Sequence, residues 1–308
     1  MDIERVYLDT LVNLNRIRLA EYGLYEVYFL EVDKERNLVF YDTGKYQLIY
    51  LPKGQIDDLR TIGNGKGRGP AEFGNPFDLK FDKKGDIWLA DVERMEVQQW
   101  GPKGDFIQSF QIDKYARPSK LAVTDLGNIY ILSEQYTPEG IIYKYTSKGE
   151  KIISFQKPEV RDYRSVLYFE GDMQVLGEEL IISGRVKPYL RRYTTNGQLK
   201  YSTGIVGFKN IDNILIHEKR WRSRNKELIR ATIDIEVYDN IIYTGISNRI
   251  DRWIRIIDLY KPNGEYKSSI HLKNPARNFS VYGNKVFTLE YNYDNDEIYL
   301  GEYEVSRK

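Results

Sequence analysis

The chain contains 308 residues, of which 41% are hydrophobic and 30% are charged. Its 46 Lys and Arg residues almost balance 45 Asp and Glu residues, so a formal charge of +1 gives no global field to attract nucleic acid or an acidic membrane. The lack of cysteine excludes disulfides, thiolate metal sites and cysteine nucleophiles. No run reaches the roughly 18 apolar residues that span a bilayer, and residues 1–10 lack the basic-then-apolar order of a signal peptide. We therefore expect neither a membrane-spanning segment nor a nucleic-acid partner.

The composition favours β-structure. Tyr occupies 26 positions and aromatic residues make up 14% of the chain, and aromatic and β-branched residues are enriched in strands. At this length the chain exceeds the usual size of one compact core, so either two domains or one large closed architecture must be considered.

A repeated unit runs along the chain. Residues 3–19 contain the alternating stretches RVYLDT and NRIRL, and a first unit then starts at Val27 with EVYFLEV, NLVFYD, YQLIYL and QIDDLRTI. The clearest unit, residues 77–110, reads FDLKFDKKGDIWLADVERMEVQQWGPKGDFIQSF, and residues 119–155 repeat its order. Two looser copies follow, MQVLGEELIISG with YLRRYTTNGQLKYS and IDIEVYDNIIYTG with RWIRIIDLYKPNGEYKSSI. The last unit has only three strands of its own, FSVYG, KVFTLE and DEIYLGEYEV.

Glycines at the expected hairpins follow the same period. Five of them are separated by 50, 45, 48 and 67 residues: Gly54, Gly104, Gly149, Gly197 and Gly264. Each stands where a tight turn needs positive φ. A period of about 40 to 50 residues, with several short strands per unit, is typical of a β-propeller.

The sequence thus predicts one all-β domain, a six-bladed β-propeller with four-stranded blades. The expected blades cover about 22–62, 75–112, 116–157, 164–205, 232–272 and 276–308. Six middle strands are present, which disfavours a seven-bladed ring or a β-sandwich pair. A strand from residues 3–19 is expected to join the last blade, because this would close the ring and remove open sheet edges. Large aromatic residues of the middle strands are expected to pack between blades: Tyr41, Trp88, Tyr130, Tyr243 and Phe287.

The segment GNGKGRGPAEFGNP, residues 63–76, followed by a strand ending in IWLAD and by DFIQSF, resembles six-bladed propellers of the NHL-repeat type. It is similar in particular to a bacterial group, abundant in Bacteroidetes, whose first blade is followed by a Gly-rich segment ending in Gly-Pro-Gly-Glu-Phe. The chain departs from that pattern at Ala71, where the group usually has Gly, and at residues 206–231, which lengthen one unit. The resemblance implies an exported lipoprotein, periplasmic or on the cell surface, and it implies no activity. A reduced cytosolic protein stays the alternative, because the lack of cysteine fits it too.

Histidine chemistry is narrowly limited. The chain has only His217 and His271, so a three-histidine zinc site is impossible and a Ser-His-Asp triad would need one of these two. We expect His271 to be a satisfied or solvated strand-end residue and His217 to be exposed in the inserted segment.

Phosphate and metal signals are incomplete. The glycines of residues 63–69 lack the spacing of a P-loop or a dinucleotide fingerprint, so this run is interpreted as a connector between blades. Carboxylates at the ends of second strands, Asp42, Asp91 and Glu134, would suit calcium. Two later blades instead end these strands with Gly184 and Gly245, and Asp91 is equally expected to accept backbone hydrogen bonds in its turn. No cofactor is expected, although calcium stays open.

The unusual segments are predicted to gather on one face. In a propeller the connections between blades, and those between second and third strands, emerge on the same side. They include residues 63–76, the basic insertion at 206–231, and the loops DVERM, GRVKPY and SNRIDRW. The candidate binding residues are Arg68, Glu72, Asp91, Arg94, Arg185, Arg220, Trp221, Arg222, Arg224 and Arg249. The sequence favours a non-catalytic recognition module for a protein or glycan partner, and the alternative is a divalent-metal-dependent hydrolase or lyase.

Overall fold

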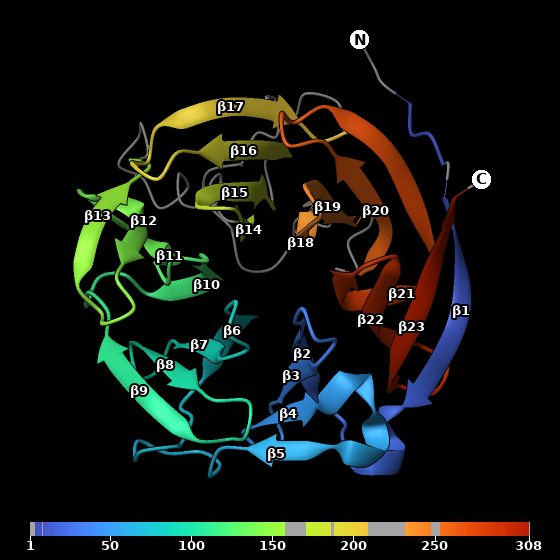
Figure 1. Ribbon diagram of the computed structural model, residues 1–308, viewed down its shortest axis with the longest axis horizontal. Helices are drawn as coiled ribbons and strands as arrows, with labels where there is room; N and C mark the ends of the chain where they lie inside the picture. The colour runs from blue at the N-terminus through green and yellow to red at the C-terminus, as the bar shows by residue number, and fades with distance from the viewer. Residues whose placement is uncertain are drawn as a thin grey trace, which may run out of the picture.

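The computed structural model describes residues 4–7, 9–157, 171–185, 188–208, 232–247 and 253–307. These residues form mostly antiparallel sheets arranged in a ring around a central axis (Figure 1). Besides strands, this part of the chain contains three short 3-10 helices, η1 (Leu19–Tyr22), η2 (Pro52–Gly54) and η3 (Ile56–Asp58). None of the described helices is long and apolar enough to cross a membrane. The predicted all-β propeller arrangement is confirmed.

Four sheets have four strands each, in chain order. The first contains β2 (Val27–Val32), β3 (Leu38–Asp42), β4 (Gln47–Leu51) and β5 (Arg60–Ile62). The second contains β6 (Pro76–Phe81), β7 (Ile87–Asp91), β8 (Glu96–Trp100) and β9 (Phe106–Gln111). The third contains β10 (Pro118–Val123), β11 (Ile129–Thr137), β12 (Gly140–Tyr145) and β13 (Lys151–Phe155). The fourth contains β14 (Gly171–Leu176), β15 (Glu179–Gly184), β16 (Tyr189–Tyr193) and β17 (Leu199–Gly204).

The remaining strands form one seven-stranded sheet in the order β1-β23-β22-β21-β20-β19-β18. Its strands are β18 (Thr232–Tyr238), β19 (Ile241–Ile246), β20 (Ile254–Tyr260), β21 (Tyr266–Tyr282), β22 (Lys285–Asn292), β23 (Glu297–Arg307) and β1 (Asp9–Arg18). The 17-residue strand β21 pairs with β20 mainly through its first half and with β22 through its second half. Strand β1 lies antiparallel to β23, so the two ends of the chain share this sheet (Figure 1).

Burial along the strands follows their distance from the axis. The middle strand β7 reads IWLAD and is buried at every position, because neighbouring sheets cover both of its faces. The outermost strand β9 reads FIQSFQ, and each of its residues is at least partly exposed. Apolar middle strands and mixed outer strands therefore arise directly from the sequence pattern.

Large aromatic residues fill the space between adjacent sheets. Trp88 packs with residues of the third sheet, and Tyr41 packs with Leu79 and Trp100 of the second. All five aromatic residues predicted for this role are buried: Tyr41, Trp88, Tyr130, Tyr243 and Phe287. Four of them lie in clusters shared by two sheets, whereas Tyr243 packs within the seven-stranded sheet.

The ring has two distinct faces. The hairpin face carries the turns that join first to second strands and third to fourth strands; the five predicted hairpin glycines all lie there, with φ between +70° and +90°. The loop-rich face carries the connections between sheets and those between second and third strands. The innermost strands of the four-stranded sheets run from the loop-rich face to the hairpin face, which fixes where each of their side chains lies along the axis.

Candidate functional site

Half of the predicted binding residues lie outside the described part of the chain, namely Arg220, Trp221, Arg222, Arg224 and Arg249, as does most of the insertion at 206–231. The structure describes the other five on the loop-rich face: Arg68, Glu72, Asp91, Arg94 and Arg185. Arg185 is half-buried just after β15, apart from the four residues at or near the 63–76 segment.

Asp91 is buried in the turn after β7. Its Oδ1 atom accepts hydrogen bonds from the backbone N–H groups of Asn75, Glu93 and Arg94 at 2.9, 3.0 and 3.0 Å, and its Oδ2 accepts one from Gly74 at 2.6 Å. Four donors occupy the carboxylate, which makes Asp91 a structural residue of this turn rather than an exposed contact.

Arg94 holds the 63–76 segment in place. Its Nη1 atom donates to the carbonyl oxygens of Gly69 and Glu72 at 2.9 and 2.8 Å, and its Nε atom lies 2.7 Å from Glu96. Glu72 in turn accepts a hydrogen bond from the Gly69 N–H at 2.6 Å. Within this group only Arg68 is exposed, so most of the polar groups that sequence reasoning assigned to binding instead order the connector.

A second group on the loop-rich face was not found from the sequence. We call it the Trp253 cluster, and it consists of Tyr28, Trp253, Arg277, Tyr291 and Tyr293. The Trp253 and Tyr291 rings are stacked with centroids 4.6 Å apart, and Tyr293 meets both rings edge-on. The Arg277 guanidinium lies 4.1 Å from the centroid of Tyr28 and 5.2 Å from that of Trp253.

The Trp253 cluster combines a fixed base with an exposed rim. Arg277 donates to the carbonyl oxygen of Val27 at 3.1 Å, and burial lowers the pKa of its guanidinium. Tyr293 is 52% exposed at the edge of the stack. Strongly oriented aromatic rings with one accessible member are typical of a contact surface.

Around the axis, the innermost strands carry a buried central charge network. Its first layer, nearer the hairpin face, contains buried Glu31, Lys80 and Glu236 together with half-buried Gln174. The second layer contains Asp78, Lys120, Asp172 and Asp234. The members of each layer come from different sheets, so the network links sheets across the ring.

Ion pairs connect the members of each layer. In the first, Lys80 pairs with Glu31, and its Nζ atom lies 3.7 Å from Glu236 Oε1. In the second, Lys120 Nζ lies 2.6 Å from Asp172 Oδ2 and 3.8 Å from Asp78 Oδ1.

Carboxylates outnumber ammonium groups in this network. It contains five acids, namely Glu31, Asp78, Asp172, Asp234 and Glu236, against Lys80 and Lys120. Burial raises the pKa of Glu31 to about 8, although Lys80 opposes the shift. Burial, together with nearby Asp172, raises the pKa of Asp234 to about 7. These two carboxyls therefore keep part of their protons near neutral pH, which reduces the negative charge of the network.

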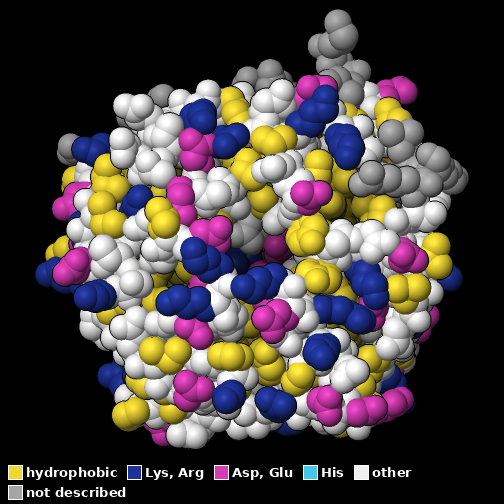
Figure 2. Space-filling view, viewed as in Figure 1, with side chains coloured by type: hydrophobic (Ala, Val, Ile, Leu, Met, Phe, Trp, Pro, Cys, Tyr) yellow, Lys and Arg dark blue, Asp and Glu magenta, His cyan; other side chains and the backbone are white. Residues whose placement is uncertain are grey.

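The first layer lies at the bottom of a cavity of about 500 Å³, which we call the channel cavity. Turn residues of the hairpin face, among them Lys34, Lys83 and Gly177, line its outer part. Figure 2 shows the ring hollowed near its centre, with basic and acidic side chains around the hollow.

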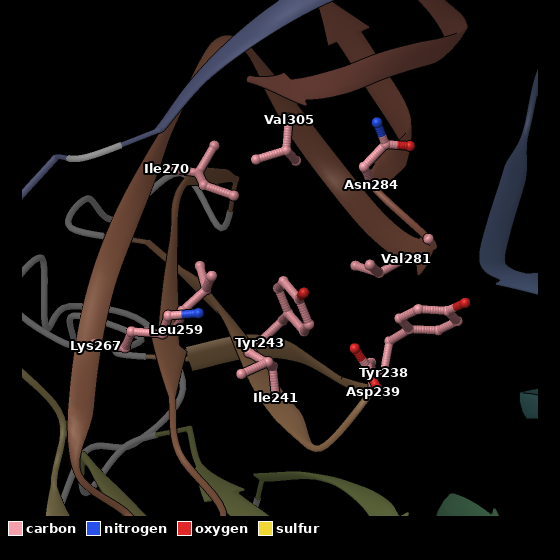
Figure 3. A pocket seen from close by; sticks show the side chains of 11 residues that line it. Tyr238, Asp239, Ile241, Tyr243, Leu259, Lys267, Ile270, Val281, Asn284 and Val305 are labelled. Atoms are coloured by element: carbon pink, nitrogen blue, oxygen red, sulfur yellow. The ribbon is translucent and has the colours of Figure 1, made fainter. Parts of the chain in front are cut away.

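Another cavity, of about 630 Å³, lies within the seven-stranded sheet. Apolar and polar side chains both line it, and in Figure 3 the side chains of Ile270, Val281 and Val305 surround one empty space into which Tyr243 points. The polar lining residues are Asp239, Lys267 and Asn284. The packing between β20 and the strands β21 to β23 is thus incomplete.

The acids considered for calcium do not converge. Asp42 accepts hydrogen bonds from the N–H groups of Gly44 and Lys45 at 2.8 and 3.1 Å, while Glu134 lies 3.6 Å from Arg117. Over the described ranges, no group of three or more His, Cys, Asp or Glu residues is arranged to hold a metal ion. His271 is exposed on β21, with the Tyr7 ring edge-on at 6.4 Å.

Comparison with known proteins supports the fold alone. No family model matches the chain. No curated protein matches it either.

Solved structures are similar at low sequence identity. A candidate exported protein from Bacteroides fragilis is 14% identical with a TM-score of 0.67, and the match covers 100% of this chain and 98% of that one. Virginiamycin B lyase from Staphylococcus aureus is 12% identical with a TM-score of 0.55, covering 90% and 80%. BamB from Moraxella catarrhalis is 10% identical with a TM-score of 0.52, covering 96% and 99%. This chain is similar to each of them as a β-propeller.

Proposed function

We propose that this chain is a non-catalytic recognition module that binds a protein partner through the Trp253 cluster on its loop-rich face. The observation that carries the proposal is the stacked Trp253–Tyr291 pair with the 52% exposed Tyr293 at its edge. Trp, Tyr and Arg are the residue types that most often dominate protein interfaces. Because ring stacking already fixes these side chains, little conformational entropy would be lost on binding.

The contacts that the described polar residues make favour recognition over catalysis. The predicted site residues that the structure describes are largely engaged in building the 63–76 segment, and the buried acids of the ring pair with Lys80 and Lys120. The likeness to a lyase is a likeness of fold at 12% identity, so it lends no weight to a lyase activity here.

We further propose that the ring consists of six blades of the NHL-repeat type. In this view the seven-stranded sheet is two blades that share β21, which would serve as the outer strand of the fifth and the inner strand of the sixth. The separate pairing of its two halves with β20 and β22 supports this division. Strand β1 would complete the sixth blade, supported by its pairing with β23.

An extracytoplasmic location, as a lipoprotein in the mature form, completes the proposal. It is supported by the Gly-rich segment at residues 63–76 and by the likeness to a candidate exported protein over the whole chain. Cell fractionation of the native host should place the protein with membranes or periplasm. Recovery from the cytosol alone would overturn this part.

Binding is tested with a matched pair of tyrosine variants. Immobilised parent protein should retain a partner from host extract that Tyr293→Ala fails to retain and that Tyr115→Ala retains; Tyr115 is 57% exposed on the same face, away from the Trp253 cluster. The partner is then purified and titrated. We expect Tyr293→Ala to weaken binding at least tenfold, or about 1.4 kcal/mol. Equal affinity of all three proteins for the partner would contradict the proposal. If the parent binds a glycan array and Tyr293→Ala does not, the Trp253 cluster would instead be assigned to carbohydrate binding.

A further inference from the structure

The channel cavity opens on the hairpin face, at the other end of the axis from the Trp253 cluster. Its bottom is formed by Glu31, Lys80, Gln174 and Glu236, which reach it from four different sheets. Below them, the second layer of the central charge network fills the axis with Asp78, Lys120, Asp172 and Asp234. The cavity of about 500 Å³ is therefore a blind pocket with a charged, buried bottom.

At the bottom of the channel cavity, one carboxylate oxygen lacks a hydrogen-bond donor. Lys80 pairs with Glu31, which leaves the second carboxylate, that of Glu236, with only a 3.3 Å hydrogen bond from Gln174 to its Oε2 atom. Glu236 Oε1 has no hydrogen-bond partner and lies 3.7 Å from Lys80 Nζ, although the residue is only 6% exposed. A buried carboxylate oxygen without a donor is costly to maintain.

Acidic residues nearer the mouth do not share this property. Asp33 Oδ1 accepts the N–H groups of Glu35 and Asn37 at 2.9 and 2.7 Å. Asp82 Oδ1 accepts that of Lys84 at 2.8 Å, and its Oδ2 atom accepts the Trp88 indole N–H at 3.0 Å. Their carboxylates build the turns, so the unmet acceptor in the pocket is Glu236.

We propose that the channel cavity binds a small ligand bearing a primary ammonium group, which donates hydrogen bonds to Glu236 and supplies its carboxylate with a counter-ion. The pairing of Lys80 with Glu31 shows that this layer already accommodates one ammonium group beside a carboxylate. A second ammonium next to Glu236 would give each first-layer acid its own counter-ion. The raised pKa values of Glu31 and Glu236, caused first by burial, have the direction expected of carboxylates that lack enough cationic partners.

An ammonium group fits better than a bare metal ion. Calcium takes six to eight oxygen ligands, whereas one oxygen of Glu236 is unmet here and the described residues hold no group arranged for a metal. The wall adds Tyr238 and Tyr282, whose rings meet edge-on at 5.9 Å, as an aromatic surface for the ligand's carbon chain. Exposed Lys34 and Lys83 at the mouth would favour a ligand whose far end is neutral or anionic.

Calorimetry with n-butylamine and n-butanol at pH 7.5 tests the proposal, because the two probes share a carbon chain and differ in the ammonium group. We expect saturable one-site binding of the amine and none of the alcohol. Glu236→Gln keeps the shape of the side chain and should weaken amine binding at least tenfold. Glu150→Gln, which makes the same change in net charge at an exposed hairpin, should bind like the parent.

A second variant keeps the proposal testable if Glu236→Gln does not fold. Gln174→Lys would place a built-in ammonium beside Glu236, so we expect it to fold with a raised melting temperature and to bind no amine. No amine binding by the parent, equal affinity in Glu236→Gln, or saturable binding of calcium in place of the amine would each overturn the proposal. Because this pocket and the Trp253 cluster lie on opposite faces, Tyr293→Ala should leave amine binding unchanged, and either proposal can fail without the other.

Discussion

The Arg16 guanidinium reaches across strand β23 to the carboxylate of Glu290 on β22, with Nε 2.7 Å from Oε2. Arg16 also lies over the Tyr299 ring of β23, 3.7 Å from its centroid. Glu290 is only 1% exposed, so this contact supplies a buried carboxylate with its charged partner. The N-terminal strand is thereby attached to two strands of the last part of the chain.

Deleting residues 1–18 should therefore destabilise the protein strongly. The deletion would expose the edge of β23 and leave Glu290 buried without Arg16, and both an open edge and an unpaired buried charge are costly. We expect a large loss of melting temperature together with aggregation, measured by thermal denaturation and light scattering. Arg16→Ala should show a smaller loss in the same direction. An unchanged melting temperature of the deletion would show that β1 does not contribute to the ring.

Asp234 is expected to make stability depend on pH. Burial raises its pKa in the folded state to about 7, from an ordinary value of 3.8. At a pH between these two pKa values, the Asp234 carboxyl is ionised in the unfolded chain but still protonated in the folded chain. The free energy of unfolding should therefore fall as pH rises from about 4 to about 7, by up to about 1.4 kcal/mol per pH unit for one proton.

Asp234→Asn should flatten that dependence. The amide cannot ionise, so the fall in unfolding free energy over this pH range should become smaller, although Glu31 still contributes up to about pH 8. Urea denaturation at several pH values measures the effect. Asp125→Asn, at an exposed turn, serves as the control, and parallel profiles for Asp234→Asn and the parent would contradict the assignment.

The strand pattern made the propeller predictable, whereas the central charge network was missed. Hydrophobic middle strands such as IWLAD and regularly spaced hairpin glycines are local signals. The network instead depends on partners from different sheets: Lys80 and Glu31 are 49 positions apart, and Gln174 and Glu236 are 62 apart. A signal was present in the inner strands, where FDLKF and IDIEV place charged residues at alternate positions of otherwise apolar stretches. Such alternation aims both charges at the axis.

The candidate binding residues illustrate another limit of sequence reasoning. The sequence predicts that polar residues of the 63–76 segment and its neighbouring loop contact a partner, but Asp91 and Arg94 instead bind backbone groups of this connector. The Trp253 cluster was not predicted because its members come from four separate segments of the chain. Local sequence does not reveal which loops meet on a closed ring.

Asp91→Ala should destabilise the second sheet. The substitution leaves the N–H groups of Gly74, Asn75, Glu93 and Arg94 without their acceptor. A hydrogen bond to a charged group contributes about 1.5 to 3 kcal/mol net of the exchange with water. We expect the free energy of unfolding to fall by at least about 2 kcal/mol. Asp125→Ala at an exposed turn should change it little. A stable Asp91→Ala variant with impaired partner binding would instead assign Asp91 to the binding surface.

The cavity in the seven-stranded sheet predicts that adding volume there stabilises the protein. Val305 lines this cavity of about 630 Å³ and is only partly buried, so Val305→Ile would extend one methylene into empty space while keeping the β-branched side chain that suits a strand. Burial of one methylene contributes about 0.8 kcal/mol, and we expect an increase of this size in the free energy of unfolding.

Val39→Ile is the matched control, because Val39 is fully buried in a filled cluster between the first two sheets. There the same extra methylene should force its neighbours apart and lower stability by about 1 to 3 kcal/mol. Urea denaturation of both variants decides the matter: a loss of stability in Val305→Ile would show that the cavity walls already close on each other in solution.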